Sequence, residues 1–325
     1  MFGASRSDAL VDDPYTSFTQ PANALVMPFD GSIDEEDESW TSFAIVSNIA
    51  GTSPTSTGEI LGVTTHWAWW SDDCEHLVDV WVCLTLNDTI VVDPCDVSSV
   101  DLGNTQIGPS TNLCDESRAG VGRGHRGFVV VTAYETDEIC SDGSIRGNIP
   151  VDNAIVGAAT RANIDLGYSF GNDAIGLGLD FTGSYTQLPK NKSEDIDIMT
   201  FNPTTVQDSS VVLISLEEQS GSGSTADVEV GPNTSSKTAS LVIYDNLEIA
   251  TSLPNHSVRC ADFTTMVPGD EGSLIPATIA VDSSGFVRLL GINDDPEEMV
   301  YAIHGQSVAN FGGSNYGKYF METLE

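Results

Sequence analysis

The chain has 325 residues, with 48 acidic and only 12 basic side chains, which gives a formal net charge of -36 at pH 7. A surface this acidic repels phosphate backbones and anionic lipid headgroups, so the composition excludes nucleic-acid binding and argues against adhesion to an anionic membrane. Hydrophobic residues still make up 40% of the chain, which is enough to build a core and excludes a disordered polyanion.

The first 22 residues are polar and precede the first extended apolar run, so we expect a flexible N-terminal arm. A short apolar step at residues 9–11 also suits addition of a strand to the sheet edge of a neighbouring copy. The arm lacks the apolar region of a secretion signal, so an exported chain would have lost its signal from this numbering. No run of 18 apolar residues occurs, and we expect no transmembrane segment.

Short runs rich in Val, Ile, Thr and aromatic residues, most of them bounded by turn residues, follow the arm and predict β-strands. In the first half they cover residues 24–27, 40–46, 62–70, 77–86, 89–92 and 127–134. In the second half they cover residues 210–216, 238–244, 258–263, 278–281 and 285–292. Apolar stretches with a helical period are scarce, so the sequence predicts an all-β protein.

Four landmarks recur in the same order in the two halves. The first landmark is a hairpin with an aromatic strand end, an acidic turn and a strand with a cysteine. It occurs in residues 66–84, with Cys83, and again in residues 241–263, with Cys260. A Gly-Phe-Val strand and two closing strands then follow in each half. The pattern predicts two tandem, internally duplicated antiparallel β-sandwich modules, at 23–188 and 189–325 after the arm at 1–22.

The cysteine content favours an oxidising compartment, because the number is even and five of the six lie close together. They are Cys74, Cys83, Cys95, Cys114, Cys140 and Cys260. We expect at least two disulfides, with preference for pairings among Cys95, Cys114 and Cys140, which lie on long loops of the first module. Cys260 is alone in the second module, so it is a buried thiol, a bridge to the first module or a link between chains.

Clusters of carboxylates mark loops where Ca²⁺ would relieve mutual repulsion, since this ion takes six to eight oxygen ligands from flexible loops. The candidate ligands are Asp34, Glu36 and Asp37 in the run after the first strand, and Asp72 and Asp73 in the acidic turn after residue 70. The alternative is a solvated acidic surface that keeps the protein soluble.

Tryptophans gather on one predicted hairpin. Strand alternation places Trp67 and Trp69 on one face of residues 66–70 and His66, Ala68 and Trp70 on the other. Buried tryptophans of this kind form a sandwich core. Trp70, together with Trp81 on the partner strand, is also a candidate platform for sugar rings.

No catalytic motif stands out, and we expect a non-enzyme. The nucleophile elbow and the phosphate-binding loop are absent from the sequence, and the five histidines have no metal-ligand spacing. The first hypothesis is an extracellular or cell-surface structural protein that self-associates into a homopolymer, as the subunit of a surface layer, sheath, filament or virion. The alternative is a secreted, calcium-dependent glycan-binding or adhesion module.

Overall fold

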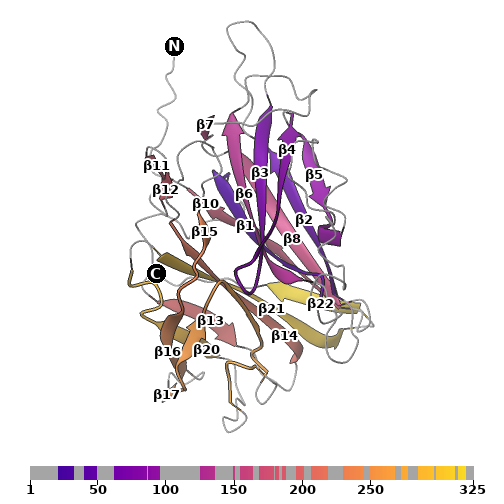
Figure 1. Ribbon diagram of the computed structural model, residues 1–325. Helices are drawn as coiled ribbons and strands as arrows, with labels where there is room; N and C mark the ends of the chain where they lie inside the picture. The colour runs from indigo at the N-terminus through magenta and orange to yellow at the C-terminus, as the bar shows by residue number, and fades with distance from the viewer. Residues whose placement is uncertain are drawn as a thin grey trace, which may run out of the picture.

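The computed structural model describes residues 21–32, 40–49, 62–85, 87–95, 125–135, 149–150, 154–163, 168–178, 180–182, 185–187, 195–200, 206–218, 230–244, 249–267, 272–276, 285–295, 298–311 and 314–319. These residues form antiparallel sheets and contain no α-helix, so the prediction of an all-β protein is confirmed (Figure 1). None of them therefore belongs to a helix that could cross a membrane. The predicted arm lies almost wholly outside the described residues, as does the predicted strand at 278–281.

The first half of the chain forms two large sheets. Sheet A has the strand order β5(Thr89–Val92), β2(Trp40–Asn48), β8(Ile155–Asn163) and β9(Tyr168–Asp173). Sheet B has the order β10(Ile175–Leu177), β1(Ala24–Asp30), β6(Arg126–Glu135), β3(Val63–Ser71) and β4(His76–Leu84), and β7(Ile149–Pro150) also pairs with β6. A separate hairpin consists of β11(Asp180–Thr182) and β12(Tyr185–Gln187).

The second half forms two further large sheets. Sheet C has the order β15(Gly231–Pro232), β14(Val206–Glu217), β21(Glu298–Phe311) and β22(Ser314–Tyr319), and β19(Ala261–Thr264) also pairs with β14. Sheet D has the order β13(Ile196–Thr200), β20(Gly285–Leu290), β16(Lys237–Tyr244) and β17(Ala250–Ser252), and β18(His256–Val258) pairs with β16.

Each half encloses its own apolar core between its two sheets. Trp67 and Trp69 of β3 are fully buried in the first core, and the ring of Trp69 meets that of Phe29 edge to face at 5.1 Å. The predicted alternation of this strand is therefore correct. In the second core, Leu213 of sheet C packs with Leu241 of sheet D.

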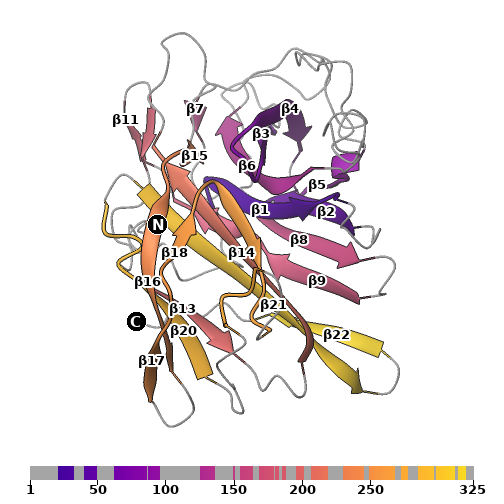
Figure 2. The ribbon, with the colours of Figure 1, turned by 60° about the horizontal axis from the view of Figure 1, so that its bottom comes forward.

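A third apolar cluster joins the two halves. Sheet B turns its second face, including Val26, Phe128 and Val130, toward a face of sheet C that includes Val212 and Ile214. Sheets B and C are therefore buried on both faces, and the layers follow the order A, B, C and D. At one side of the stack, β9 of sheet A also lies beside β22 of sheet C (Figure 2).

The two halves pair their strands in the same order. Sheet B has the order β1-β6-β3-β4 and sheet D has the order β13-β20-β16-β17, so in each case the first, fourth, second and third strands along the chain are neighbours in that order. Sheet A and sheet C match in the same way, because β14 lies between β19 and β21 as β2 lies between β5 and β8. Sheet B therefore corresponds to sheet D, and sheet A corresponds to sheet C.

Candidate functional site at the junction of sheets B and C

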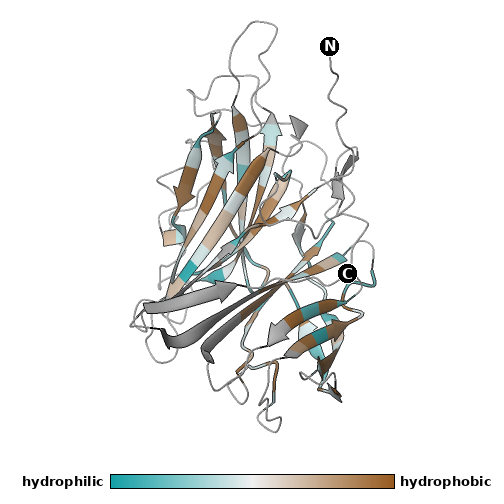
Figure 3. Cartoon of the chain, turned by 180° about the vertical axis from the view of Figure 1, so that it is seen from behind, coloured by the Kyte–Doolittle hydropathy of each residue, from teal (hydrophilic) through white to brown (hydrophobic). Residues whose placement is uncertain are grey.

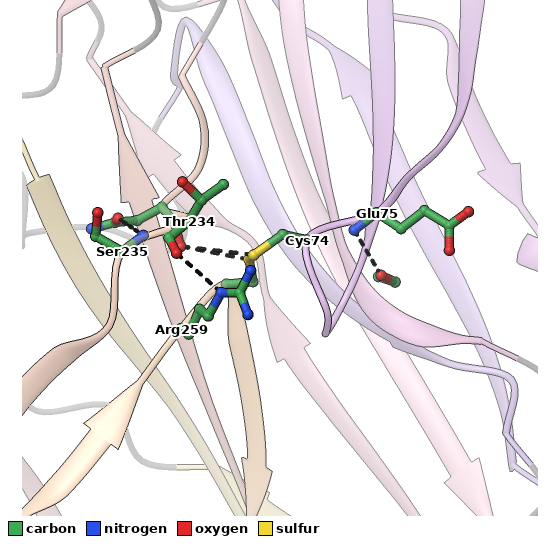
Figure 4. Close-up of a disulfide and its surroundings, with 8 residues drawn as sticks. Cys74, Glu75, Thr234, Ser235 and Arg259 are labelled. Carbon is green, nitrogen blue, oxygen red and sulfur yellow. Dashed lines mark hydrogen bonds between the residues drawn. A yellow bond between two sulfur atoms is a disulfide. The ribbon is translucent and has the colours of Figure 1, made fainter.

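A disulfide joins the two halves at the tip of the β3–β4 hairpin. Cys74 in the hairpin turn is bonded to Cys260, which lies 186 positions later in the bend between β18 and β19 (Figure 4). Their Cα atoms are 5.4 Å apart, which is ordinary disulfide geometry. Of the three alternatives for Cys260, the structure selects the bridge to the first half of the chain.

Both half-cystines occupy the left-handed region of the backbone map, with φ of 70° at Cys74 and 53° at Cys260. This conformation is unfavourable for a residue with a Cβ atom and persists only where neighbouring contacts enforce it. At Cys74 the contacts come from the turn, in which Ser71 N donates to Glu75 O at 2.9 Å and Glu75 N donates to Ser71 Oγ at 3.0 Å.

Cys260 is held by the main chain of sheet C and of the segment that follows β15. Ser215 N donates to the Cys260 carbonyl at 2.6 Å, and Cys260 N donates to the Asn233 carbonyl at 3.1 Å. That carbonyl also lies 3.5 Å from Cys260 Sγ and 3.9 Å from Cys74 Sγ (Figure 4). A disulfide has no proton to donate, so these two are packing contacts. Arg259 Nε donates to Thr234 O at 3.0 Å and secures the same segment.

Charged side chains surround the disulfide. Arg126 Nε donates to Asp72 Oδ2 at 2.6 Å, and the Arg126 guanidinium lies 5.2 Å from the centre of the Phe263 ring of sheet C. The guanidinium of Arg161, a fully buried residue of β8, lies 5.7 Å from the same ring. Burial lowers the pKa of Arg126, but the hydrogen bond and charge of Asp72 outweigh it and hold that pKa above its ordinary value.

Asp30, at the end of β1, supplies a buried carboxyl to the same region. Its Oδ1 accepts hydrogen bonds from Ser32 N at 3.0 Å and from Ser32 Oγ at 2.5 Å. Burial raises the pKa of Asp30 more than Ser32, Arg161 and Arg126 lower it. Asp30 is only 6% exposed, so its carboxyl is enclosed within the junction and has no open approach for a ligand.

Two histidines share one carboxylate on the second face of sheet B. Asp79 Oδ1 lies 3.1 Å from His66 Nε2 and 2.9 Å from His76 Nε2. The His66 ring stacks on Trp81, with centres 4.5 Å apart. Burial raises the pKa of Asp79, but the hydrogen bonds and charges of the two histidines lower it more, so this carboxyl titrates well below its ordinary value.

A carboxylate that orients an imidazole is half of a general-base arrangement. Here His66 is 2% exposed, so a substrate has no approach to its ring. The pairing instead ties β3 to β4, the strands that carry the Cys74 turn.

The acidic residues predicted to bind calcium are separated by the structure. Asp34, Glu36 and Asp37 lie outside the described residues. Asp72 is engaged by Arg126, whereas Asp73 is exposed at the tip of the turn. Across the described ranges, no three His, Cys, Asp or Glu side chains are grouped to hold a metal ion. Calcium binding by the acidic run at 34–38 stays a prediction.

The two tryptophans predicted as a sugar platform differ in exposure. Trp81 is 2% exposed beneath His66 and Tyr134, so it has no open face for a sugar ring. Trp70 is half-buried, packs at the edge of the B–C cluster and meets His76 edge to face at 4.6 Å. The structure therefore uses both rings to support the hairpin.

The remaining cysteines are partly described. Cys83 on β4 and Cys95 after β5 are disulfide-bonded, while Cys114 and Cys140 lie outside the described residues. The preferred pairings among Cys95, Cys114 and Cys140 therefore stay predictions. The expected equivalence of Cys83 and Cys260 is not seen, because Cys83 lies within a strand and Cys260 in a bend with positive φ.

Sequence reasoning missed Asp79 and Arg126 as the residues that organise this junction. A signal for Asp79 was available, because the β3–β4 register places it on the same sheet face as His66 and Trp81. No local signal marks the contact of Arg126 with Phe263, since the two residues are far apart in the sequence and belong to different sheets.

No protein-family model matches this chain, and no curated protein is significantly similar to it. The function is therefore inferred from the geometry of the junction and of the sheet faces.

Proposed function

We propose that this protein is a non-enzymatic, extracellular structural subunit that assembles into a filament, sheath, surface layer or virion. The observation that carries the proposal is the junction of sheets B and C. Two β-sandwiches that share a largely apolar contact and a disulfide behave as one rigid block, which is the property that a subunit under mechanical load requires.

The apolar contact gives the block most of its stability. Four fully buried residues lie at its centre, Phe128 and Val130 from sheet B and Val212 and Ile214 from sheet C. Burying side chains of this size contributes about 1.5–3 kcal/mol each, so their sum of about 6–12 kcal/mol is comparable with the net stability of a whole domain. The sandwiches are not free to move as separate domains around a ligand cleft.

The disulfide supports an extracellular location for the proposed subunit. The bond joins two residues that are 186 positions apart in the sequence, so it constrains the unfolded chain strongly. Such a bond persists in an oxidising compartment. The paired charges Asp72–Arg126 and His66–Asp79 brace the hairpin that carries Cys74. Side chains that catalysis would use are thereby committed to structure.

We also propose that the two halves, 23–188 and 189–325, are duplicated modules. The identical order of strand pairing in sheets B and D, and in sheets A and C, supports this origin. So do the two separate cores, one for each half.

Electron microscopy of the purified, oxidised protein tests the proposal. We expect regular polymers at physiological salt and above, because screening relieves the repulsion between copies with a net charge of -36. Particles that stay monomeric at every salt and protein concentration, with calcium present, would contradict the structural role. Calcium-dependent binding of such monomers to a glycan array would favour the adhesion alternative.

A further inference from the structure

Each sandwich has two outer faces, one on each of its sheets, and only one of them takes part in the contact between the halves. Sheet B docks on sheet C, which leaves the outer faces of sheet A and sheet D at the two ends of the stack. Because sheet D corresponds to sheet B and sheet A corresponds to sheet C, the free faces are the counterparts of the two faces that already bind each other.

Sheet D repeats the aromatic residues of the docked face of sheet B. In sheet B, Trp70 pairs with Phe128 across β3 and β6, and both belong to the B–C cluster. At the matching place in sheet D, Tyr244 pairs with Phe286 across β16 and β20, and their rings stack at 4.7 Å. Tyr244 and Phe286 lie on the face opposite the second core and are half-buried.

Sheet A repeats the apolar residues of the docked face of sheet C. In sheet C, Val212 pairs with Ile303 on one side and with Phe263 on the other, and all three lie in or against the B–C cluster. In sheet A, Ile45 pairs with Ala158 on one side and with Val91 on the other. These three side chains point away from the first core, and Val91 is 54% exposed.

We propose that copies of this chain stack head to tail, with sheet D of one copy docked on sheet A of the next. The new contact repeats the B–C contact inside each chain, so a single geometric rule generates the whole stack. A contact between two different faces leaves one free face at each end and propagates into an open polymer. The inference rests on the structural role proposed above and specifies its contact.

Charge makes these two faces suitable for a second copy. The outward residues of β5, β2 and β8 include no ionisable side chain, although the chain has 48 acidic residues. The exposed Asp173 of β9, opposite Ala158, lies toward the edge of this face. Figure 3 views the molecule from behind, where the strands of sheet A are mostly pale or brown. On sheet D, Arg288 and Asp197 neutralise each other through two contacts of 2.6 Å. Copies that meet here do not bring unpaired carboxylates of these strands together.

The size of the faces fits a reversible contact. A strand of nine residues such as β2 is about 30 Å long and four strands are about 19 Å wide, which gives roughly 500 Å² for each face. Two such faces remove roughly 1,000 Å² from water, close to the lower limit for a specific interface. We therefore expect assembly that depends on protein concentration and strengthens with salt.

Two variants, each altered on one face, test the direction of stacking. Phe43→Asp/Val91→Asp adds two carboxylates to sheet A at exposed positions, and Ser240→Asp/Tyr244→Asp adds two to the outer face of sheet D. The control Asn87→Asp/Asn255→Asp adds the same charge in exposed turns outside the strands of both faces. All are compared with the wild-type chain by analytical ultracentrifugation and electron microscopy, after circular dichroism establishes that each is folded.

We expect the control to polymerise like the wild type and each face variant alone to lose assembly, with an apparent dissociation constant raised about 100-fold or more. A mixture of the two face variants should form a one-to-one dimer, because each contributes the intact face that the other lacks. A mixture that stays monomeric, or a sheet A variant that still polymerises, overturns head-to-tail stacking. A wild-type chain that never assembles overturns the structural role as well, which separates the two failures.

Discussion

The docked face of sheet B and the free face of sheet D occupy the same place in the strand order but differ in charge at a pair of neighbouring positions. Val130 of β6 lies between Val26 and Ala68 in sheet B, whereas Arg288 of β20 lies between Asp197 and Val242 in sheet D. An apolar pair in the permanent contact is thus matched by an ion pair in the face that stays open to water.

This difference fits the proposed stacking, in which one sheet design serves two purposes. A face that is buried during folding never meets water again, so apolar side chains suit most of it. A face that must remain soluble until a partner arrives needs polar groups that are already satisfied, and the Arg288–Asp197 pair provides them. The hydrogen bond and charge of Asp197 raise the pKa of Arg288, so the guanidinium keeps its charge over the whole accessible pH range.

Placing the charge of sheet D into sheet B should have the largest effect. In Val130→Arg the guanidinium would be buried against sheet C without the carboxylate that Arg288 has, so we expect a loss of more than about 4 kcal/mol in the free energy of unfolding. Urea denaturation followed by tryptophan fluorescence measures it. Val91→Arg, on an exposed position, should change stability by less than about 0.5 kcal/mol. Equal effects of the two substitutions would contradict the assignment of docked and free faces.

Removing the disulfide should have the next largest effect. Cys74→Ala/Cys260→Ala frees a long loop of the unfolded chain, so we expect a loss of about 3–5 kcal/mol, reduced where the left-handed backbone at both sites relaxes. The apolar B–C contact remains, so thermal unfolding by calorimetry should still occur in one transition. Two separate transitions would show that the disulfide, rather than the sheet contact, holds the sandwiches together.

The reverse exchange, which places the apolar residues of sheet B into sheet D, should change the stability less. Asp197→Val/Arg288→Val gives sheet D the residues of the docked face. Replacing an ion pair by apolar side chains is often neutral or stabilising, so we expect the free energy of unfolding to rise by about 0–2 kcal/mol. Assembly should become tighter and the protein less soluble. Sedimentation at fixed salt measures both changes. A loss of stability above about 2 kcal/mol would mean that the pair is required for folding.

The smallest effect concerns acid stability of the β3–β4 hairpin. The folded-state pKa of Asp79 is below the ordinary value of 3.8, so its contribution is present above pH 3.8 and is lost as the pH falls through the folded-state pKa. At neutral pH, Asp79→Asn should therefore lower the free energy of unfolding by up to about 1 kcal/mol, since the carboxylate is partly open to water. The free energy of unfolding of this variant should fall little further in acid. Asp73→Asn, in the turn of the same hairpin, is the control. If the stability curves of the wild type and Asp79→Asn run parallel between about pH 2 and 7, the coupling between Asp79 and the two histidines is refuted.

Much of the fold could be predicted from local patterns. Alternation along β3 identified Trp67 and Trp69 as core residues, and the repeated Gly-Phe-Val strand located β6 and β20 at equivalent places. The continuous apolar run Phe128 to Val131 in β6 is also typical of a strand buried on both faces, although it does not say which sheet covers it.

The candidate site could not be predicted to the same extent. Six cysteines allow 15 pairings, and no spacing rule selects Cys74 with Cys260 when they lie on different sandwiches. The local sequence around Trp70 and Trp81 is the same whether their rings are open to a ligand or covered, because their exposure depends on the sheet packed above them. Contacts between distant segments, such as Arg126 with Phe263, exist only after both sandwiches have folded.

The spacing of the stacked layers distinguishes head-to-tail stacking from other modes of assembly. Packed sheets lie about 10 Å apart, so a head-to-tail stack of four-layered copies should repeat every ~40 Å along its axis, with a weaker subdivision near ~20 Å from the two similar sandwiches. Cryo-electron microscopy of wild-type polymers measures this repeat. A repeat near 40 Å with sheet D against sheet A agrees with the account, whereas polymers joined through other faces, or a back-to-back dimer through sheet A, contradict it.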